Sequence, residues 1–497
     1  MKQRDKISTQ DHVSEYYEEQ GNVLKVLLVN PPNERLITAN VPDYYVSGSS
    51  TCLPPLGLLN IATYLDQNTV HSVDIFDSLV YRASYEQIAA KSLDYDLVGI
   101  TTITFYLMDV IETVKAIRRV NQSIPIVLGG PHVAIYPAET VQIPGVNFCM
   151  TGECDQTFTL LVNKIAEERG DYGNIPGLYW IEEGKVQSNP GDDFIQDLNT
   201  LPIPDRNLLE YKHYNSILSH KSLGRNYVTT AFSSRGCPYK CIFCDRPHLG
   251  KKFRAMSAAR VVEEIKECLE LNIREVMFYD DTFTIHKKRV YEICELIFEQ
   301  GIEIKWDIRA RVDTVDYPML KLLKRAGCCR IHFGVEAANP EMMKILKKGI
   351  TQMQVTEAFK NARKAGIETL GYFMFGCPGE TRSQMQETLD FALGLNPDYA
   401  HFAILTPFPG TPLYHEALKQ GWFDEDYWQA YAKSPDPEFM PKYLPNTLPR
   451  EELIEIQKKA NKAFYLRPRY LLRQTLRVRS WKDFIRKFTI AVRIFLH

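Results

Sequence analysis

Long apolar runs are absent from this sequence. No stretch approaches the roughly 18 consecutive apolar residues that favour a membrane-spanning helix. Net charge is nearly absent too: 59 basic residues stand against 61 acidic residues, so the composition gives no argument for a nucleic-acid partner. The opening stretch MKQRDKISTQDHVSEYYEEQ is polar throughout and does not resemble a signal peptide. We therefore expect a cytoplasmic location and no nucleic-acid binding.

The cysteines lack the paired spacing of structural zinc sites. The chain has 11 of them, and one dense group, Cys237, Cys241 and Cys244, lies in SSRGCPYKCIFCDRP with no second CxxC and no CxxH nearby. Structural zinc needs four ligands, and disulfides are not expected in a reducing cytoplasm. Three thiolates that leave one position open favour an iron–sulfur cluster, with zinc or a chance grouping as the alternatives. We interpret the other cysteines as buried small hydrophobic residues, and Cys377 alone as a candidate for a catalytic role.

Two series of alternating strand-like and helix-like segments organise the chain as an α/β protein. The first series has strand-like runs at 25–30, 72–76, 97–104, 125–129 and 146–150. It predicts a doubly wound, Rossmann-like parallel sheet that binds its ligand at the carboxyl edge. The second series has its strand-like runs at 227–232, 276–281, 304–311, 331–337, 370–376 and 400–405. It predicts a partial (β/α)6 TIM-type barrel with its chemistry at the carboxyl ends of the strands.

These series set the expected domain boundaries. We predict a flexible tail, an N-terminal α/β domain, a linker rich in Pro, Gly and Asp, the barrel, and a mainly helical C-terminal region with a basic end. Their ranges are 1–22, 23–165, 166–224, 225–415 and 416–497.

The cysteine group carries a resemblance to a known family. The CxxxCxxC spacing at Cys237, Cys241 and Cys244, at the end of the first strand of the second series, resembles the radical S-adenosylmethionine superfamily over about 225–415. The resemblance implies that these cysteines hold a 4Fe–4S cluster whose fourth iron binds the amino and carboxylate groups of S-adenosylmethionine. It also implies a 5′-deoxyadenosyl radical that abstracts hydrogen from an unactivated carbon, a small-molecule substrate, and a reducing partner such as flavodoxin or ferredoxin.

Several strand ends fit the same resemblance. Phe243 matches the aromatic position that lies near the adenine in this family. Asp280 and Asp281, in FYDDTF, follow the second strand, where family members contact the methionine end or the substrate. Gly376, in YFMFGCPGET, belongs to the glycine-rich strand end that lies along S-adenosylmethionine.

Charged residues at two further strand ends are candidates for the catalytic site. Arg309 and Arg311, in RARVD, could bind a carboxylate through two parallel hydrogen bonds. Glu336 ends the fourth strand, and together with Asp281 and Arg311 it is a predicted catalytic residue. For each of these residues taken singly, a structural ion pair is an equally good interpretation.

The first series resembles the cobalamin-binding domain found ahead of many radical S-adenosylmethionine cores. The matching stretches are VLLVNPP, PPLGLLNIATYL, VGITTITF, VLGGPHVAIYP and TGECDQTF. Small residues there would let the backbone approach a bulky ring. The candidate cobalamin-binding residues are Gly57, Thr101, Thr102, Gly129, Gly130, His132, Gly152 and Glu153.

One familiar feature of cobalamin-binding proteins is missing. The DxHxxG motif, whose histidine replaces the nucleotide base beneath cobalt, does not occur in this sequence. His132 follows a proline in the wrong place for that motif, so we interpret it as a structural or ring-edge contact rather than an axial ligand. The sequence is also compatible with an N-terminal domain that keeps the fold but has lost cobalamin.

The C-terminal segment from Arg467, RPRYLLRQTLRVRSWKDFIRKFTIAVRIFLH, has nine Lys or Arg and a single acid. Its apolar residues repeat at helical spacing and line up on one face: Trp481, Phe484, Ile485, Phe488, Val492 and Phe495. A basic amphipathic helix of this kind suits peripheral contact with an anionic membrane surface. Packing against the protein's own core or a partner subunit is the alternative.

Together the two resemblances imply a cobalamin-dependent radical enzyme. Methylation of an unreactive carbon is the most common outcome of this pairing, and the basic helix makes an apolar or lipid-like substrate plausible. Ring-forming, ring-contracting or oxidative chemistry with the same cofactors is one alternative. A non-catalytic protein that senses cobalamin or redox state is another, and the charged strand ends count against it.

Overall fold

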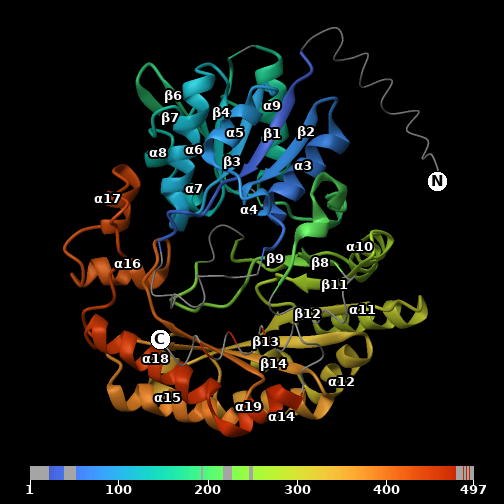
Figure 1. Ribbon diagram of the computed structural model, residues 1–497, viewed down its shortest axis with the longest axis vertical. Coiled ribbons are helices and arrows are strands. Elements are labelled where there is room, and N and C mark those ends of the chain that lie inside the picture. The colour runs from blue at the N-terminus through green and yellow to red at the C-terminus, as the bar shows by residue number, and fades with distance from the viewer. Residues whose placement is uncertain are drawn as a thin grey trace.

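The computed structural model describes residues 22–37, 52–168, 170–191, 194–216, 227–245 and 250–476, together with Ile485, Thr489 and Val492. Two α/β layers lie one above the other, and the helical C-terminal region runs along the side of both (Figure 1). No helix in the described residues is long and apolar enough to cross a membrane.

The N-terminal sheet has the strand order β2-β1-β3-β4-β5-β6-β7. Its parallel strands are β1 (Lys25–Asn30), β2 (Ser72–Asp77), β3 (Leu97–Thr101), β4 (Ile126–Gly129) and β5 (Phe148–Met150). Alternate residues of β1 enter two different hydrophobic clusters, so both faces of the sheet are covered. The doubly wound architecture predicted from the first series is confirmed.

Helices lie on both faces of this sheet. On one face are α3 (Leu56–Asn68) and α9 (Cys154–Ala166), and on the other are α5 (Tyr85–Ser92) and α6 (Leu107–Val120). Short helices follow two of the strands at the carboxyl edge: α4 (Ser78–Tyr81) follows β2, and α7 (Pro131–Ile135) and α8 (Pro137–Thr140) follow β4.

The stretch 166–224, which the sequence predicts to be a linker, adds to the fold. Its first part forms β6 (Leu178–Glu182) and β7 (Lys185–Ser188), which extend the N-terminal sheet in antiparallel fashion. Further along, the buried Arg206 donates a hydrogen bond from Nη2 to Glu264 Oε1 of the barrel at 2.6 Å. Tyr214 donates to Asp77 of the N-terminal domain at 2.9 Å. The expected linker is therefore packed between the two layers.

The second sheet has the order β15-β14-β13-β12-β11-β8 and is parallel throughout. Its strands are β8 (Tyr227–Ala231), β11 (Ile273–Phe278), β12 (Lys305–Ala310), β13 (Cys328–Glu336), β14 (Glu368–Phe375) and β15 (Tyr399–Ile404). Its helices are α10 (Ala258–Glu270), α11 (Lys287–Glu299), α12 (Tyr317–Arg325), α13 (Pro340–Ile345), α14 (Gln352–Ala365) and α15 (Arg382–Leu395). This is the six-unit partial barrel predicted from the second series.

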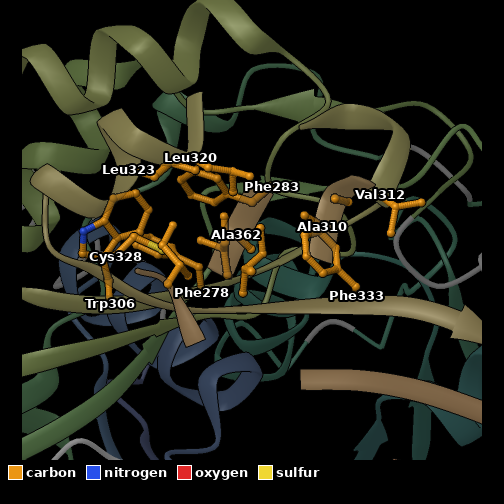
Figure 2. Close-up of a cluster of buried hydrophobic side chains, with 14 of the residues drawn as sticks. Phe278, Phe283, Trp306, Ala310, Val312, Leu320, Leu323, Cys328, Phe333 and Ala362 are labelled. Carbon is orange, nitrogen blue, oxygen red and sulfur yellow. The ribbon is translucent and has the colours of Figure 1, made fainter. Parts of the chain in front are cut away.

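The core of the barrel lies between the sheet and its helices. Trp306 and Ala310 point from β12 toward these helices, and Figure 2 shows Trp306 near Phe278 and Ala310 beside Phe333. The ring centroids of Phe278 and Trp306 are 5.7 Å apart, an edge-to-face contact. Ile308 belongs to the same cluster, and because side chains alternate along a strand, Asp307 and Arg309 face the other side of the sheet.

Side chains mark where the barrel helices begin. Thr351 and Thr381 form capping boxes at the starts of α14 and α15, each with a glutamine three residues later. Ser257 and Asp316 accept backbone N–H groups in the first turns of α10 and α12. Each cap satisfies N–H groups that have no partner within the helix.

The C-terminal region joins the two layers. Its helices are α16 (Pro412–Lys419), α17 (Tyr427–Lys433), α18 (Arg450–Tyr465) and α19 (Pro468–Leu476). Trp428 of α17 is buried in a hydrophobic cluster that includes residues of both layers. Gln457 of α18 donates to the carbonyl of Phe402 in β15 at 2.9 Å. The region therefore fixes the N-terminal domain on the barrel.

The basic end is described only in part. Tyr470 of α19 is buried and donates a hydrogen bond to the carbonyl of Asp398 at 3.2 Å. Ile485 and Val492 are helical and 49% and 37% exposed. The other residues of the expected amphipathic helix lie outside the described residues. The first turns of the basic end thus pack on the barrel, in line with the alternative that this segment packs against the protein's own core. The apolar helical face predicted beyond residue 476 stays a prediction.

Candidate functional site

The three clustered cysteines lie in one loop at the carboxyl end of β8. Two short antiparallel strands, β9 (Ser234–Arg235) and β10 (Arg254–Ala255), stand at its start and end. Gly236 opens the loop with φ +81°, a conformation that favours glycine. We call residues 236–253 the cysteine loop; its residues 246–249 lie outside the described residues. All the cysteines are free thiols.

The charge environment of these thiols depends on a metal. Burial raises the pKa of Cys237 and raises that of Cys244 to about 12, and the nearby Asp281 and Cys241 act on both thiols in the same direction. Without a metal the thiols of Cys237 and Cys244 are therefore protonated, whereas iron ions would hold them as thiolates. In the described part of the chain, no three His, Cys, Asp or Glu side chains converge on a single metal ion. An iron–sulfur cluster needs only one thiolate on each of three irons, so this loop fits a cluster.

Arg311 connects the cysteine loop to β12. Its guanidinium carbon lies 3.7 Å from the ring centroid of Tyr239, and its Nε and Nη2 donate to the two oxygens of Asp313 at 3.0 and 2.9 Å. Burial alone would lower the pKa of Arg311, but the hydrogen bonds and charge of Asp313, with Cys241, raise it. Arg311 Nη1 is buried and has no partner among the described residues. This free N–H could donate a hydrogen bond to a cofactor bound at the loop, either to a sulfide of a cluster or to a carboxylate oxygen.

Glu336 and Lys348 form a buried pair at the end of β13. Lys348 Nζ donates to Glu336 Oε1 at 2.9 Å, and both side chains are about nine-tenths buried. Glu336 has φ +71°, an uncommon conformation for a residue with a side chain, which turns it at the strand end. Lys348 Nζ also lies 5.8 Å from the ring centroid of Phe243, and its carbonyl accepts a hydrogen bond from Arg311. These contacts bring Phe243, Arg311 and Glu336 together around the cysteine loop.

The neighbouring acids Asp280 and Asp281 have different surroundings. Asp280 is 1% exposed and accepts hydrogen bonds from Ser233 N at 2.7 Å, Ser233 Oγ at 2.6 Å and Ser234 Oγ. Asp281 is exposed, and its charge acts on Cys237 and Cys244. Asp280 therefore holds the strand that leads into the cysteine loop, and Asp281 is the acid near the thiols. Contact of either residue with S-adenosylmethionine stays a prediction.

Gly376 and Cys377 follow β14. Gly376 has φ +80°, which glycine adopts without strain. Cys377 is fully buried in the hydrophobic cluster shared by both layers, and its N–H donates to Glu380 Oε2 at 2.9 Å. Burial raises the pKa of the Cys377 thiol well above its usual range and raises that of Glu380 to about 7. These surroundings match a packing role for Cys377 better than a catalytic one.

At the carboxyl edge of the N-terminal sheet, Thr101, Thr102 and Gly130 fit closely together. Gly130 has φ +105°, and a Cβ there would lie 2.9 Å from the carbonyl oxygen of Thr102 and 3.2 Å from Thr101 Oγ1. The close approach of β3 and the loop after β4 therefore requires glycine. Gly57 and Gly152 have no heavy atom within 4 Å of such a Cβ, and Gly129 has only one, at 3.9 Å. These open positions leave room for a bulky ring at this edge.

His132 is fully buried beside this edge. Its Nδ1 lies 3.1 Å from Thr104 Oγ1, and its Nε2 has no partner among the described residues. Burial lowers the pKa of His132 to about 4, so the imidazole is neutral near pH 7. A neutral ring with one free nitrogen can form one more hydrogen bond, which fits a polar group at the edge of a cobalamin ring. This role stays a prediction.

Glu153 takes part in an ion-pair group between the two layers. It forms two hydrogen bonds with Arg254, at 2.7 and 2.8 Å, and accepts the N–H of Ile195 at 2.9 Å. Arg235 forms two hydrogen bonds with Asp155 and lies 3.5 Å from Glu153. The four charged side chains are at most 7% exposed. We call Glu153, Asp155, Arg235 and Arg254 the interdomain clasp. The carboxylate of Glu153 is engaged in the clasp, and its predicted cobalamin contact is untested.

Some residues of this site were not predicted from the sequence. Lys348, Asp313 and Tyr239 hold Glu336 and Arg311 in place, and Asp155 completes the clasp. A signal existed for Tyr239 and Arg235, because both lie inside the cysteine motif. Asp155 carries no comparable signal, because its partner Arg235 is 80 residues away in the sequence. Lys348 is only 12 residues from Glu336, but no motif links the two positions.

Comparisons with known proteins agree with this geometry. Residues 232–392 match the radical SAM superfamily, and residues 44–162 match the B12 binding domain. A methyltransferase of uncharacterised function from Pyrococcus horikoshii is 36% identical over 456 residues, which are 91% of this chain and 94% of that protein. The anaerobic magnesium-protoporphyrin IX monomethyl ester cyclase of Rubrivivax gelatinosus is 30% identical over 388 residues, 76% of this chain and 68% of that protein.

The fold is also similar to that of a solved structure. The cobalamin-dependent S-adenosylmethionine radical enzyme OxsB, with aqua-cobalamin and S-adenosylmethionine bound, superimposes with a TM-score of 0.72 and 18% identity, covering 96% of this chain and 72% of OxsB. With the two matched domains, these findings confirm a radical enzyme whose cofactors are a 4Fe–4S cluster, S-adenosylmethionine and cobalamin. The chain belongs to the cobalamin-binding radical S-adenosylmethionine enzymes.

Proposed function

We propose that this protein methylates an unactivated carbon of a small-molecule substrate held between its two layers. The observation that carries the proposal is that the carboxyl edges of both sheets meet. Phe105 follows β3, Phe408 follows β15, and their ring centroids are 5.3 Å apart. The interdomain clasp joins the end of β5 to the two strands beside the cysteine loop. A cofactor at either edge would thus face the other.

The bound cofactors supply the chemistry: S-adenosylmethionine gives the 5′-deoxyadenosyl radical at the cluster, and cobalamin carries the methyl group. The protein's own residues bind and orient them. Cys237, Cys241 and Cys244 would hold the cluster, and the free Nη1 of Arg311 would donate a hydrogen bond to it or to the S-adenosylmethionine carboxylate. The pair of Glu336 and Lys348 lies next to Phe243, where it can bind the nucleoside end.

Water exclusion follows from the packing around the site. Cys377, Leu405 and Trp428 belong to one buried hydrophobic cluster that also contains strands of the N-terminal sheet. These hydrophobic side chains would shield a radical formed beside them from solvent, which limits side reactions. We propose flavodoxin or ferredoxin as the electron donor, because the sequence has no second three-cysteine group that could carry another cluster.

Ring formation is the second candidate. It is favoured by the similarity to the Rubrivivax gelatinosus cyclase, which is 30% identical to this chain. Cyclisation and methylation begin with the same hydrogen abstraction, so the residues around the cysteine loop serve either. The two differ in whether the methyl group of S-adenosylmethionine appears in the product.

Peripheral membrane contact and a lipid-like substrate are part of the proposal. The exposed Ile485 and Val492 lie on the face that the sequence predicts to be apolar. Since α19 packs on the barrel through Tyr470, a clean test removes only residues 477–497. Loss of binding to vesicles of anionic lipid would support membrane contact, and unchanged binding would contradict it.

Methyl transfer is tested with S-adenosylmethionine that carries a deuterated methyl group. The reconstituted protein is given an electron donor and a metabolite extract, and products are analysed by mass spectrometry. The proposal expects formation of 5′-deoxyadenosine and a product with the deuterated methyl on carbon. 5′-Deoxyadenosine together with an unlabelled cyclised product would favour ring formation instead.

A further inference from the structure

The inner face of the barrel sheet, the side away from its helices, is rich in charge. On β12, Ile308 and Ala310 pack toward the helices, so Asp307, Arg309 and Arg311 lie on the inner face. On β13, Arg330 pairs in register with Asp307, and His332 with Arg309. In barrels of this kind the active site lies at the carboxyl ends of the strands, next to the inner face of the sheet.

Two of the three arginines on this face have carboxylate partners. Arg311 forms two hydrogen bonds with Asp313. Arg330 donates to Glu368 Oε2 at 3.0 Å and lies 3.9 Å from Asp307. Their charges are therefore compensated within the protein.

Arg309 is different. Its Nη1 donates to the carbonyl of Phe278 at 3.0 Å, and its guanidinium carbon lies 3.6 Å from the ring centroid of Tyr279. Within the described ranges it forms no ion pair with any carboxylate, and its side chain is only partly buried. A cation held in a fixed orientation, with most of its N–H donors unused, is ready to bind an anion.

The groups around Arg309 are aromatic and polar. Arg309 lies close enough to His332 and Tyr372 to interact electrostatically with both. His332 Nδ1 is 3.0 Å from Tyr372 Oη, and the Tyr372 ring is 5.8 Å from that of His401. Tyr279, Tyr372 and His401 are partly exposed on this face, so they can contact a bound molecule.

We propose that Arg309 binds an anionic group, a carboxylate or a phosphate, of the substrate, with Tyr279 and Tyr372 beside it. This inference rests on the proposed function, since it names the substrate class of the same site. It places the anion near the carboxyl end of β12, two residues before Arg311, on the side of the sheet where the cofactors are expected. A lipid-like substrate would then be an amphipathic acid.

Binding is tested with two small acids that represent the two sources of negative charge. The reconstituted full-length protein, with S-adenosylmethionine present, is dialysed to equilibrium against radiolabelled benzoate, phenyl phosphate or the neutral methyl benzoate. We expect saturable binding of at least one acid and none of methyl benzoate. Binding should weaken about 10- to 100-fold in Arg309→Gln and less in Arg309→Lys, which keeps the charge.

The matched control is Arg274→Gln, which removes an exposed arginine of β11. It should leave acid binding unchanged. Equal binding to wild type and Arg309→Gln, or no saturable binding of either acid to wild type, would overturn the inference. An Arg309→Gln variant that loses affinity only for S-adenosylmethionine would overturn it too, since Arg309 would then bind the cofactor.

A second experiment separates this inference from the proposed function. The metabolite extract is divided on an anion-exchange resin before it is assayed with deuterated S-adenosylmethionine. Label in a product from the anionic fraction supports both claims. If label appears only in the neutral fraction, methyl transfer is supported and the proposal of an anionic substrate is overturned. If no fraction carries label, methyl transfer is contradicted, and the dialysis experiment alone decides whether Arg309 binds an anion.

Discussion

Arg235 and Asp155 form two parallel hydrogen bonds, Nη1 to Oδ2 at 2.9 Å and Nη2 to Oδ1 at 3.1 Å, between the barrel and the N-terminal domain. Arg235 is two residues before Cys237, and Asp155 follows β5 at the edge where cobalamin is expected. Both side chains are buried, so the pair fixes the cysteine loop relative to that edge. The distance between the two cofactor sites therefore depends on this contact.

The first prediction concerns the clasp. Asp155→Asn leaves the Arg235 charge buried with one of its carboxylate partners lost, which typically costs about 3–5 kcal/mol. We expect a lower free energy of unfolding in denaturant and lower iron content after gel filtration, since the clasp holds both strands beside the cysteine loop. The control is Asp66→Asn, which removes an exposed acid of α3. Equal unfolding midpoints for the two variants would contradict the prediction.

The second prediction concerns the cluster ligands. Cys241→Ala removes one of the three thiolates, so we expect loss of the iron–sulfur absorbance and of S-adenosylmethionine cleavage. Cys154→Ser is the matched control, because Cys154 donates only to backbone carbonyls, at 3.6 and 3.7 Å, and serine can do the same. That variant should keep full iron content. Retention of the absorbance in Cys241→Ala would show that the cluster is held elsewhere.

The third prediction concerns the space beside Glu336. A Cβ at Gly334 would collide with Glu336 Oε1 and lie 2.7 Å from Lys348 Nζ. Gly334→Ala should therefore displace this pair and raise the KM for S-adenosylmethionine by about tenfold or more, while the fold is retained. Kinetics of 5′-deoxyadenosine formation measure the effect.

Gly394→Ala provides the control for that substitution. Gly394 lies in α15 with no atom within 4 Å of an added Cβ, so alanine should stabilise the protein by about 0.5–1 kcal/mol. Its KM should not change. An unchanged KM in Gly334→Ala would argue against a role of the Glu336 pair in cofactor binding.

The fourth prediction concerns pH. The pKa of His132 falls from 6.5 to about 4 in the fold, so the unfolded chain binds a proton more readily between these values. The stability that neutral His132 contributes is therefore complete above about pH 6.5 and is lost as the pH falls, by about 1.4 kcal/mol per unit. His132→Phe should remove this slope. Parallel pH curves for wild type and variant would contradict the burial argument.

The sequence predicted the two sheets because their strands carry the signal themselves. On β12, apolar Trp306, Ile308 and Ala310 alternate with charged residues, and this pattern marks a strand with one face on a core. The pair β6 and β7 was missed because its residues are mostly exposed and lie in a stretch rich in Pro, Gly and Asp. This hairpin forms because β6 pairs with β5, and its own residues show no alternation of apolar and polar side chains that would predict a strand.

The site could be predicted where its residues are close in the sequence or end a predicted strand, as Arg311 and Glu336 do. Cys237, Cys241 and Cys244 define their own spacing, and the chain folds them into one loop. Asp155 and Arg235 are 80 residues apart, and nothing local links them. The same holds for Arg309: its position at a strand end is visible in the sequence. That no carboxylate of the described ranges pairs with it depends on how the neighbouring strands place their charges.

The central claim, methyl transfer by a cobalamin-dependent radical enzyme, is tested most directly by following the methyl group. The protein is reconstituted with iron, sulfide and hydroxocobalamin, desalted, and given deuterated S-adenosylmethionine with a metabolite extract and an electron donor. The account predicts that the chain retains cobalt and iron and that a carbon of the product carries the deuterated methyl group. Cleavage of S-adenosylmethionine with no methyl label in any product, by a protein that retains iron but no cobalt, would contradict it.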